Sequence, residues 1–343
     1  MCNLPTKWHH EQNSIAMFDY LLEQNDDVQK KFQQYGIEEC DMEMIKRMIK
    51  GMDPETETIP ETIEYRGETY QKWFLYEVVA NKRTGIDCDK FDYFARDSHQ
   101  VGVKNSFNHM RFFQNIRVLG VGGQLQVCVR DKEVVNLYEI FHVRWKLHYS
   151  VYQHKTTKVL EDMLFKALHA VDSTFGISAS VHDMSSYMWM TDSIVYEILR
   201  STKNTPAVKT AQEILHKLQK RELYAFCGEV NVCNTNRTTS ECTSEEIGKE
   251  IGGMSEAICA EDVFVDITYI GIGKKGRDPI NHVAFFTKHG GVTKRPSRDV
   301  SQLIPNKFEE EYIRVWSRHA NKKKDVQQSF ALWMNANKSP QES

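Results

Sequence analysis

Residues 134–147 read VVNLYEIFHVRWKL, and apolar side chains recur in this stretch at every third or fourth position. This spacing is typical of an α-helix that buries one face. The same period indicates helices over residues 15–22, 45–49, 73–79, 107–118, 159–171, 185–199 and 207–218. The sequence therefore predicts a mainly α-helical body.

The pattern changes toward the C-terminus. Alternating or β-branched runs predict short strands, and a polar segment at residues 228–261 contains a weak helix start at Thr243. The predicted strands are residues 124–129, 223–226, 263–270 and 282–287, two further helices are predicted at residues 307–319 and 324–337, and residues 52–68 are predicted to form a solvated loop. We expect residues 228–343 to form a small α+β lobe after the helical residues 1–227.

Composition narrows the class of protein. The chain has 343 residues, of which 41% are hydrophobic and 27% are charged, and this balance favours a folded globular protein over a disordered one. A net charge of -3 gives no argument for whole-surface attraction to nucleic acid or membranes. The eight cysteines form no CxxC pair, so we expect buried thiols in a reducing compartment. Because the first residues lack an apolar signal core and no run approaches 18 apolar residues, we expect neither secretion nor a membrane span.

Residues 271–276 match the GxGxxG pattern of dinucleotide-binding loops. That motif requires a helix directly after the glycines, whose N-terminus would meet the pyrophosphate. Here Pro279 and a second strand follow instead. We therefore expect a hairpin loop between Tyr269 and His282.

Two other motifs also have simple structural explanations. The His182–Asp183 pair could bind a metal, but Asp183 is well placed to cap a short helix, which we favour. The basic run Lys322–Lys324 could be a phosphate-binding or targeting patch, and a solvated helix face is the favoured interpretation.

Residues 81–97, NKRTGIDCDKFDYFARD, are more informative. Asp89, Tyr93 and Asp97 are spaced i, i+4, i+8 and would share one face of a helix, whereas Asp92 and Arg96 would form an ion pair on its outer face. Burial of two carboxylates on one stripe would require cations or metals nearby. A solvated stripe is the alternative.

Arg144, His148 and Tyr152 repeat the i, i+4, i+8 spacing. A guanidinium, an imidazole and a phenol on one side suit an anionic ligand with an aromatic or sugar part, because arginine binds phosphate through two hydrogen bonds. A solvated or interface face is again the alternative. Together the two stripes would supply acids for a metal and cations for phosphates, which predicts a phosphoester or nucleotide site.

These residues also resemble a known family. The stretches at residues 7–12, 81–97, 130–133, 136–138, 152–155, 281–283 and 300–303 closely resemble the vertebrate SAM- and HD-domain-containing deoxynucleoside triphosphate (dNTP) triphosphohydrolases. The resemblance implies that residues 1–227 are the C-terminal part of an HD-type catalytic domain, a helical body incomplete at its N-terminus. Residues 228–343 would be an α+β lobe of the same functional unit. The implied reaction is water attack at the α-phosphorus, which gives a deoxynucleoside and inorganic triphosphate.

The resemblance also implies the roles of individual residues. Asp89 matches a ligand of the family's divalent metal (Zn, Fe, Mn or Mg), and His10 matches a catalytic histidine near the α-phosphate. Lys90 and Arg144 would hold phosphates, Tyr152 would pack beneath the deoxyribose, and Asp97 with Gln153 would bind the sugar 3′-hydroxyl. The positions that match the dNTP pocket are Lys90, Tyr93, Asp97, Arg144, His148, Tyr152 and Gln153.

The family is activated when GTP and a dNTP bind between subunits and assemble a tetramer. The matching positions are Arg111, Arg130, Lys132, Asn136, His154, Lys155, Arg221 and Lys288. Three departures should loosen this regulation: Asn108 replaces a guanine-reading aspartate, Tyr149–Ser150 replaces an arginine pair, and Ala225 replaces a lysine. Single-stranded nucleic acid is a further candidate partner. The resemblance implies a nuclear location, with the cytosol as the alternative.

The family's SAM domain, its first metal-binding histidine and its His-Asp pair lie upstream of anything that matches Lys7–Trp8, so we expect the chain to be N-terminally truncated. His182–Asp183 cannot replace that pair, because it follows Asp89 in the chain. A catalytic metal needs roughly three or four protein ligands. Two hypotheses stay open: a dNTP triphosphohydrolase, or an inactive chain that binds nucleotide or other subunits. A phosphodiesterase acting on another ester is less favoured, because Tyr152 and Gln153 are present.

Overall fold

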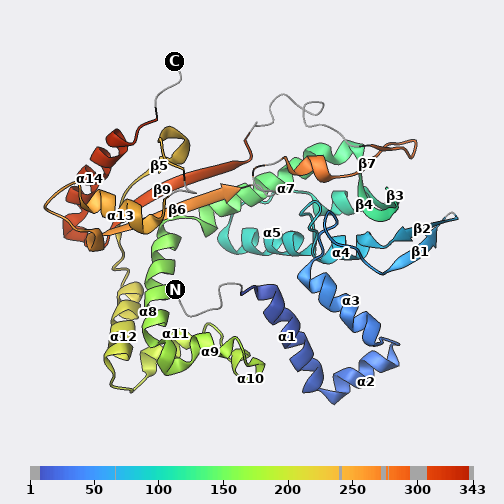
Figure 1. Cartoon of the computed structure of the whole chain (residues 1–343), viewed down its shortest axis with the longest axis horizontal. Helices are drawn as coiled ribbons and strands as arrows, with labels where there is room; N and C mark the ends of the chain where they lie inside the picture. Colours follow the sequence, from blue (N-terminus) through green and yellow to red (C-terminus); the bar gives the residue numbers. More distant parts are fainter. Residues whose placement is uncertain are drawn as a thin grey trace.

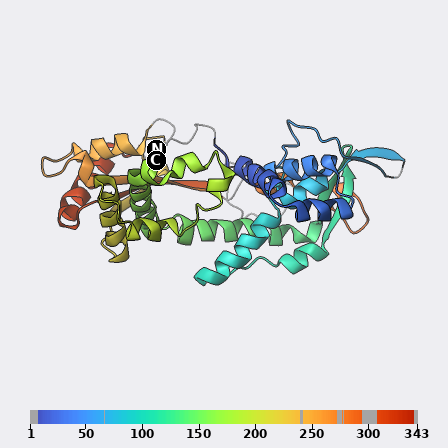
Figure 2. The same cartoon turned by 90° about the horizontal axis from the view of Figure 1, so that it is seen from below.

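The computed structural model describes residues 8–65, 67–238, 242–271, 276, 278–293 and 307–339. The molecule is elongated. Helix α7 (Val134–Leu147) runs from the end that contains the larger sheet toward the C-terminal lobe, which contains the smaller one (Figures 1 and 2). None of the helices in these ranges is long and apolar enough to cross a membrane.

The fold is mainly α, as predicted. Helices α4 (Trp73–Val79) and α7 have the predicted bounds, and Asp183 caps α10 (Met184–Tyr187) by accepting a hydrogen bond from the Ser185 amide. The other helices are α1 (His10–Glu23), α2 (Asp26–Gln34), α3 (Glu39–Lys50), α5 (Cys88–Val101), α6 (His109–Gln114), α8 (Lys155–Phe175), α9 (Ile177–Ser180), α11 (Ile194–Arg200), α12 (Pro206–Gln219), α13 (Ser244–Gly252) and α14 (Lys323–Ala336).

The strands form two separate sheets. One has the order β1-β2-β4-β7-β8, with β3 paired to β4, and the other has the order β5-β9-β6 with both pairs antiparallel. The strands are β1 (Thr62–Tyr65), β2 (Glu68–Gln71), β3 (Ile116–Val121), β4 (Gln124–Arg130), β5 (Ala225–Asn231), β6 (Val263–Gly271), β7 (Phe285–Phe286), β8 (Val292–Thr293) and β9 (Glu309–Ser317). Strand β5 runs across the expected boundary between residues 227 and 228.

The helix predicted at residues 307–319 is wrong, because this segment is strand β9. As the central strand of its sheet, β9 buries five consecutive residues from Ile313 to Ser317. A strand covered on both faces loses the polar–apolar alternation that would have revealed it. The hairpin expected between Tyr269 and His282 is also wrong, since β6 pairs with β9 and β7 pairs with β4 and β8. Residues 272–275 of the GxGxxG match lie outside the described residues.

Four other predicted segments differ less from the structure. The helix predicted at 107–118 ends at Gln114, and the 185–199 helix is divided into α10 and α11. The solvated loop at 52–68 includes strand β1, and the 282–287 strand is reduced to β7. Pairing of β3 with β4 from Ile116 ends the first of these helices, and pairing of β1 with β2 forms a strand inside the predicted loop.

Cysteine burial was predicted only in part. The seven described cysteines are free, and Cys128 is fully buried, but Cys40, Cys88, Cys233 and Cys259 are exposed, so the general expectation of buried thiols is wrong. Of the Lys322–Lys324 run, Lys323 and Lys324 are exposed on α14, as predicted. Lys322 instead donates to Asp262, with 2.6 Å between Nζ and Oδ2.

Helix α7 organises the body. Its buried side chains, including Leu137, Ile140 and Phe141, pack with Phe94 of α5 and with Phe285 of β7 in one cluster. The lobe has a separate core, in which α13 and α14 pack on the β5-β9-β6 sheet. Trp316 of β9 packs against Val159 of α8 and joins the lobe to the body.

Candidate functional site: two facing polar stripes on α5 and α7

Helix α5 presents the first predicted stripe. Asp87 caps the start of the helix by accepting a hydrogen bond from the Lys90 amide. Phe94, on the inner face of the helix, is fully buried in the core. This fixes the rotation of α5, so that Asp89, Tyr93 and Asp97 follow one another along one face. On the outer face Arg96 and Asp92 form the predicted ion pair, with 2.7 Å between Nη2 and Oδ2.

The second stripe faces the first. Arg144 donates from Nη1 to the Tyr93 hydroxyl at 3.1 Å, and the Tyr152 hydroxyl donates to Asp97 Oδ2. The rings of Tyr93 and Tyr152 meet edge to face, with 6.4 Å between their centroids. The solvated alternative is therefore wrong for these four side chains, because each contacts the opposite stripe. Residues far apart in the sequence come together as one polar, partly buried site.

The second stripe is not a continuous α-helix. Helix α7 ends at Leu147, and residues His148–Tyr152 form a π-helical turn, η2. The Gln153 amide donates to the His148 carbonyl at 2.7 Å, which is the i→i−5 bond of a π-helix. Such turns are frequent at functional sites, because the wider turn directs side chains where an α-helix could not.

Burial sets the protonation of the site. It lowers the pKa of His148 to about 4, and the neighbouring Arg144 cation adds to that effect. Burial also raises the pKa of Tyr93 and, together with the hydrogen bond to Asp97, that of Tyr152. At neutral pH the site therefore contains a neutral imidazole and two protonated phenols around the Arg144 cation.

The low pKa of His148 predicts a pH-dependent stability. Above pH ~6.5 this histidine is neutral in both the folded and unfolded states. As the pH falls from there toward 4, the unfolded chain takes up a proton that the folded chain does not, so the free energy of unfolding decreases. Chemical denaturation between pH 4 and 7 should show a smaller decrease for His148→Gln than for the wild type. Equal pH dependence in both would contradict the prediction.

Two buried polar atoms of the site have no hydrogen-bond partner among the described residues: Nε of Arg144 and Oε1 of Gln153. An unsatisfied buried donor or acceptor costs about 1–3 kcal/mol. The site thus presents one donor and one acceptor that a bound molecule could satisfy. A phosphate oxygen is a suitable acceptor for the guanidinium, and a hydroxyl is a suitable donor to the amide.

Lys90 and Asp89 lie at the N-terminal end of α5. Nζ of Lys90 is 3.5 Å from Asp87 Oδ1, and Asp89 is exposed. His10 is farther away along the chain, on α1, where its side chain is 79% exposed and Nδ1 lies 3.4 Å from Glu11 Oε2. Its catalytic role stays a prediction.

A resident metal does not fit the described residues. They contain no group of three or more His, Cys, Asp and Glu side chains that could hold an ion. Asp89 alone would offer one carboxylate, whereas a catalytic metal needs roughly three protein ligands. The Asp183 carboxylate of the His182–Asp183 pair accepts from Ser185 and Ser186 at the start of α10, as its capping role requires.

Four of the predicted regulatory residues gather around the turn Asp131–Glu133. Glu133 is fully buried, its Oε1 lies 2.8 Å from Nη2 of Arg111, and its Oε2 accepts from Asn136 Nδ2 at 3.2 Å. The guanidinium of Arg130 lies 5.8 Å from the centre of the Phe286 ring, and Lys132 is exposed. Asn108, at the departure from the family pattern, caps α6 by accepting from the Arg111 amide.

The other four lie elsewhere. His154 caps α8, with Nδ1 accepting from the Thr156 amide at 3.2 Å, and Lys155 Nζ sits 4.7 Å from the Phe226 ring centre. Arg221 follows α12 with a φ of 60°, and Lys288 lies in the turn between β7 and β8. Nothing in these contacts tests a nucleotide site, so these residues stay predictions.

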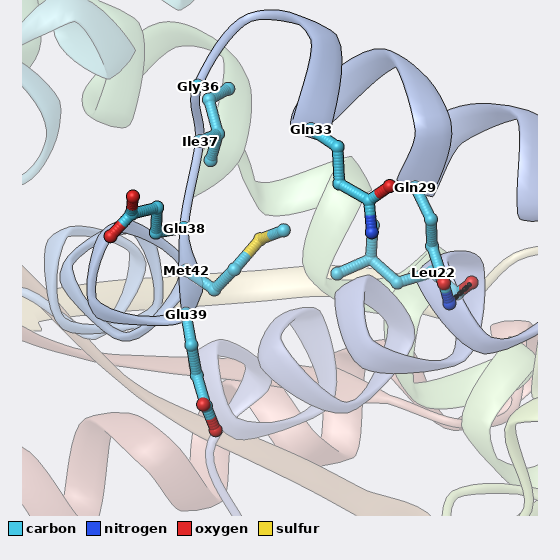
Figure 3. A pocket seen from close by; sticks show the side chains of 8 residues that line it. All are labelled: Leu22, Gln29, Gln33, Gly36, Ile37, Glu38, Glu39 and Met42. Atoms are coloured by element: carbon cyan, nitrogen blue, oxygen red, sulfur yellow. Dashed lines mark hydrogen bonds between the residues drawn. The ribbon is translucent and has the colours of Figure 1, made fainter.

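Two cavities lie away from these sites. One, of about 690 Å³, is an open hollow lined by α1, α2 and the start of α3, with Leu22, Gln29 and Gln33 facing Met42 across it (Figure 3). The other, of about 430 Å³, is lined by Arg83, Gln124 and His282 among others. None of the predicted site residues lines either cavity.

The sequence prediction missed one residue that reaches the site. Arg314 of β9 is only 4% exposed and donates from Nη1 to the main-chain carbonyl of Gln153. The available signal was its position among the apolar residues Ile313, Val315 and Trp316, because an arginine is rarely buried unless its charge is paired. The helix predicted for this segment concealed it.

Comparison with known proteins shows which proteins this chain is similar to. The family described as "HD associated region" matches residues 125–278. The deoxynucleoside triphosphate triphosphohydrolase SAMHD1 of Homo sapiens is 37% identical over 95% of this chain and 55% of its own length. The SAMHD1 of Gallus gallus is 38% identical over 91% of this chain and 53% of its own length. The SAMHD1 homolog of Dictyostelium discoideum is 30% identical over 98% of this chain and 60% of its own length.

The chain therefore spans a little over half the length of these curated relatives, and the alignment extends along almost the whole of it. It includes the helices α5 and α7 that carry the two stripes. Over the part of those proteins that it spans, the chain belongs to the family of SAMHD1 deoxynucleoside triphosphate triphosphohydrolases.

Proposed function

We propose that the chain binds a dNTP between α5 and the η2 turn, as the nucleotide-gripping part of a dNTP triphosphohydrolase. The observation that carries this proposal is the pairing of Arg144 with Tyr93 and of Tyr152 with Asp97, beside the unsatisfied Arg144 Nε and Gln153 Oε1. The names of the human and chicken relatives support the substrate class. The products would be a deoxynucleoside and inorganic triphosphate.

Each side chain has a role that its chemistry suits. Arg144 and Lys90 would bind phosphate oxygens, and the neutral His148 would offer a hydrogen bond without adding a second cation beside Arg144. The Tyr152 ring would pack beneath the deoxyribose and leave no room for a 2′-hydroxyl. Asp97 and Gln153 would bind the 3′-hydroxyl. His10 would act at the α-phosphate, where the attacking water displaces the deoxynucleoside oxygen.

A second candidate is nucleotide binding without turnover. It is favoured by the lack of a metal-binding group among the described residues. A divalent metal would supply charge stabilisation at the phosphates and an activated water, and Asp89 is the one described residue that we propose as its ligand. In this reading the chain would hold a nucleotide or associate with other subunits.

Regulation by GTP and dNTP, with assembly into a tetramer, is the corresponding proposal for the remaining residues. The cluster at Glu133 brings together Arg111 and Asn136 beside the exposed Lys132, and the cations of Arg111 and Lys132 would suit a triphosphate. Asn108 would read guanine less strictly than a carboxylate, because an amide oxygen accepts two guanine N–H donors less well. Single-stranded nucleic acid is a candidate ligand of the same cations, and a nuclear or cytosolic location fits these substrates.

One experiment separates the two candidates. The purified chain is incubated with dGTP, GTP and Mg²⁺ or Mn²⁺, and released triphosphate is measured while size-exclusion chromatography follows assembly. Triphosphate release that Arg144→Met abolishes supports the hydrolase. Binding or a nucleotide-dependent size shift without release supports the second candidate, and neither binding nor release contradicts both.

A further inference from the structure

Arg314 is the most informative basic residue outside the pocket. It stands on β9 of the C-terminal lobe, yet its side chain is only 4% exposed. Nε donates to Glu229 Oε2 at 2.9 Å, and Nη1 donates to the carbonyl oxygen of Gln153. A buried guanidinium is costly unless its donors are satisfied, so both contacts hold it in place.

The Gln153 carbonyl is a specific target for this side chain. It follows the last residue of the η2 turn, where helical carbonyls lack an intrahelical partner and favour a nearby cation. Tyr152 and Gln153, the residues proposed to contact the sugar, lie at this end of the turn. The hydrogen bond from Arg314 therefore connects the lobe to the main chain at the end of the η2 turn.

Two neighbouring contacts hold the same segment. Lys155 Nζ lies 4.7 Å from the ring centre of Phe226 on β5, and Lys158 Nζ is 3.8 Å from Asp266 Oδ1 on β6. All three strands of the lobe sheet therefore contact the chain between residues 153 and 158. Of these contacts, the one made by Arg314 is closest in sequence to Tyr152.

The Gln153 side chain gives an independent sign that the turn is prepared for a ligand. Its Oε1 is buried without a hydrogen-bond partner among the described residues, although its main chain is held at both N–H and C=O. Because the main chain of Gln153 is fixed at both groups, the orientation of its unsatisfied Oε1 is restricted as well. That arrangement has a cost that a bound hydroxyl would remove.

We infer that Arg314 is a positioning residue: the lobe fixes the η2 turn through it, so that Tyr152 and Gln153 meet the sugar of the nucleotide. This inference rests on the proposed function and deepens it, because it makes the sugar discrimination of the pocket depend on the C-terminal lobe. Arg314 itself would not touch the nucleotide.

The test compares the affinity of the chain for dCTP and CTP, which differ only in the 2′-hydroxyl, by equilibrium binding with Arg144→Met as the blank. Arg314→Met should weaken dCTP binding by ~10-fold, the effect of about one hydrogen bond to a charged group, while CTP binding changes less. The dCTP preference should therefore fall. Arg314→Lys should lose the preference as well, because one ammonium would remain paired with Glu229 and leave the carbonyl.

Arg318→Met is the matched control. Arg318 also joins the lobe to α8, with Nη1 3.1 Å from Asp162 Oδ2, but it has no contact with the η2 turn among the described residues. It should leave the preference for dCTP unchanged, even if it lowers the melting temperature. Circular dichroism confirms that each variant is folded, and Arg314→Lys, which keeps the buried cation, provides the result if Arg314→Met does not fold.

The outcomes are distinct. A wild-type chain without dCTP binding above the Arg144→Met blank contradicts the proposed function itself. Wild-type binding with an unchanged dCTP preference in a folded Arg314 variant overturns the inference alone. An equal loss of preference in Arg318→Met also overturns it, since the effect would then be general loosening of the lobe.

Discussion

Arg144→Met is expected to weaken the binding of a dNTP by about 100-fold. The side chain provides a cation between the two helices and a buried Nε that has no hydrogen-bond partner among the described residues. It also donates from Nη1 to Tyr93, which links the two helices. A methionine at this position has no charge, no Nε donor and no hydrogen bond to Tyr93, but its side chain still fills most of the space.

Titration with dCTP by calorimetry measures this effect. Arg96→Met on α5 is the matched control, because Arg96 is exposed, lies on the outer face and pairs only with Asp92 among the described residues. Its dCTP affinity should stay within about twofold of the wild-type value. An Arg144→Met chain that binds as tightly as the control would show that the nucleotide does not bind between α5 and η2.

Trp316→Ala is expected to lower the free energy of unfolding by about 3–5 kcal/mol, the range for removal of a buried large aromatic side chain. Trp316 is 1% exposed. Its ring lies 5.6 Å from that of Phe226 and 5.1 Å from that of Phe264, between β5 and β6. It also packs in one cluster with Val159 and Met163 of α8, so the substitution leaves a cavity where the lobe meets the body.

Urea denaturation followed by far-ultraviolet circular dichroism gives the measurement. Trp189→Ala is the control, since Trp189 is 70% exposed and its loss should change stability by less than about 0.5 kcal/mol. Because Trp316 and Arg314 are near neighbours on β9, Trp316→Ala should also weaken the dCTP preference. A Trp316→Ala protein as stable as Trp189→Ala would mean that the lobe and body do not share this core.

The sequence predicted the helices best where one face is buried and the other is solvated. In α7 and α8 this arrangement leaves the 3.6-residue period intact, and the period gave the bounds of α7 directly. It failed for β9, because this strand lies between β5 and β6 and packs against α13 and α14 on one face and against α8 on the other, so both of its faces are buried and the period of two is lost. The helical period also failed for the helix predicted at residues 107–118, because β3 begins at Ile116 and its pairing with β4 ends α6 at Gln114.

The candidate site was likewise predictable from the sequence only in part. The local spacing of Asp89, Tyr93 and Asp97, and of Arg144, His148 and Tyr152, identified two chemical faces. It did not show that they face each other, which depends on the rotation of α5 and α7 about their shared core at Phe94 and Phe141. The π-helical turn at His148–Tyr152 was also not predictable, because it depends on one shifted backbone hydrogen bond.

The sequence by itself determined the helical body, the two stripes and the family resemblance, because these depend on residue type and on spacing of a few positions along one helix. Only the tertiary structure decided that Arg144 meets Tyr93, that Tyr152 meets Asp97, and that Arg314 reaches the Gln153 carbonyl from the lobe. These contacts join residues between 51 and 161 positions apart. Such pairs form only when packing of the two cores fixes the helices and strands relative to one another.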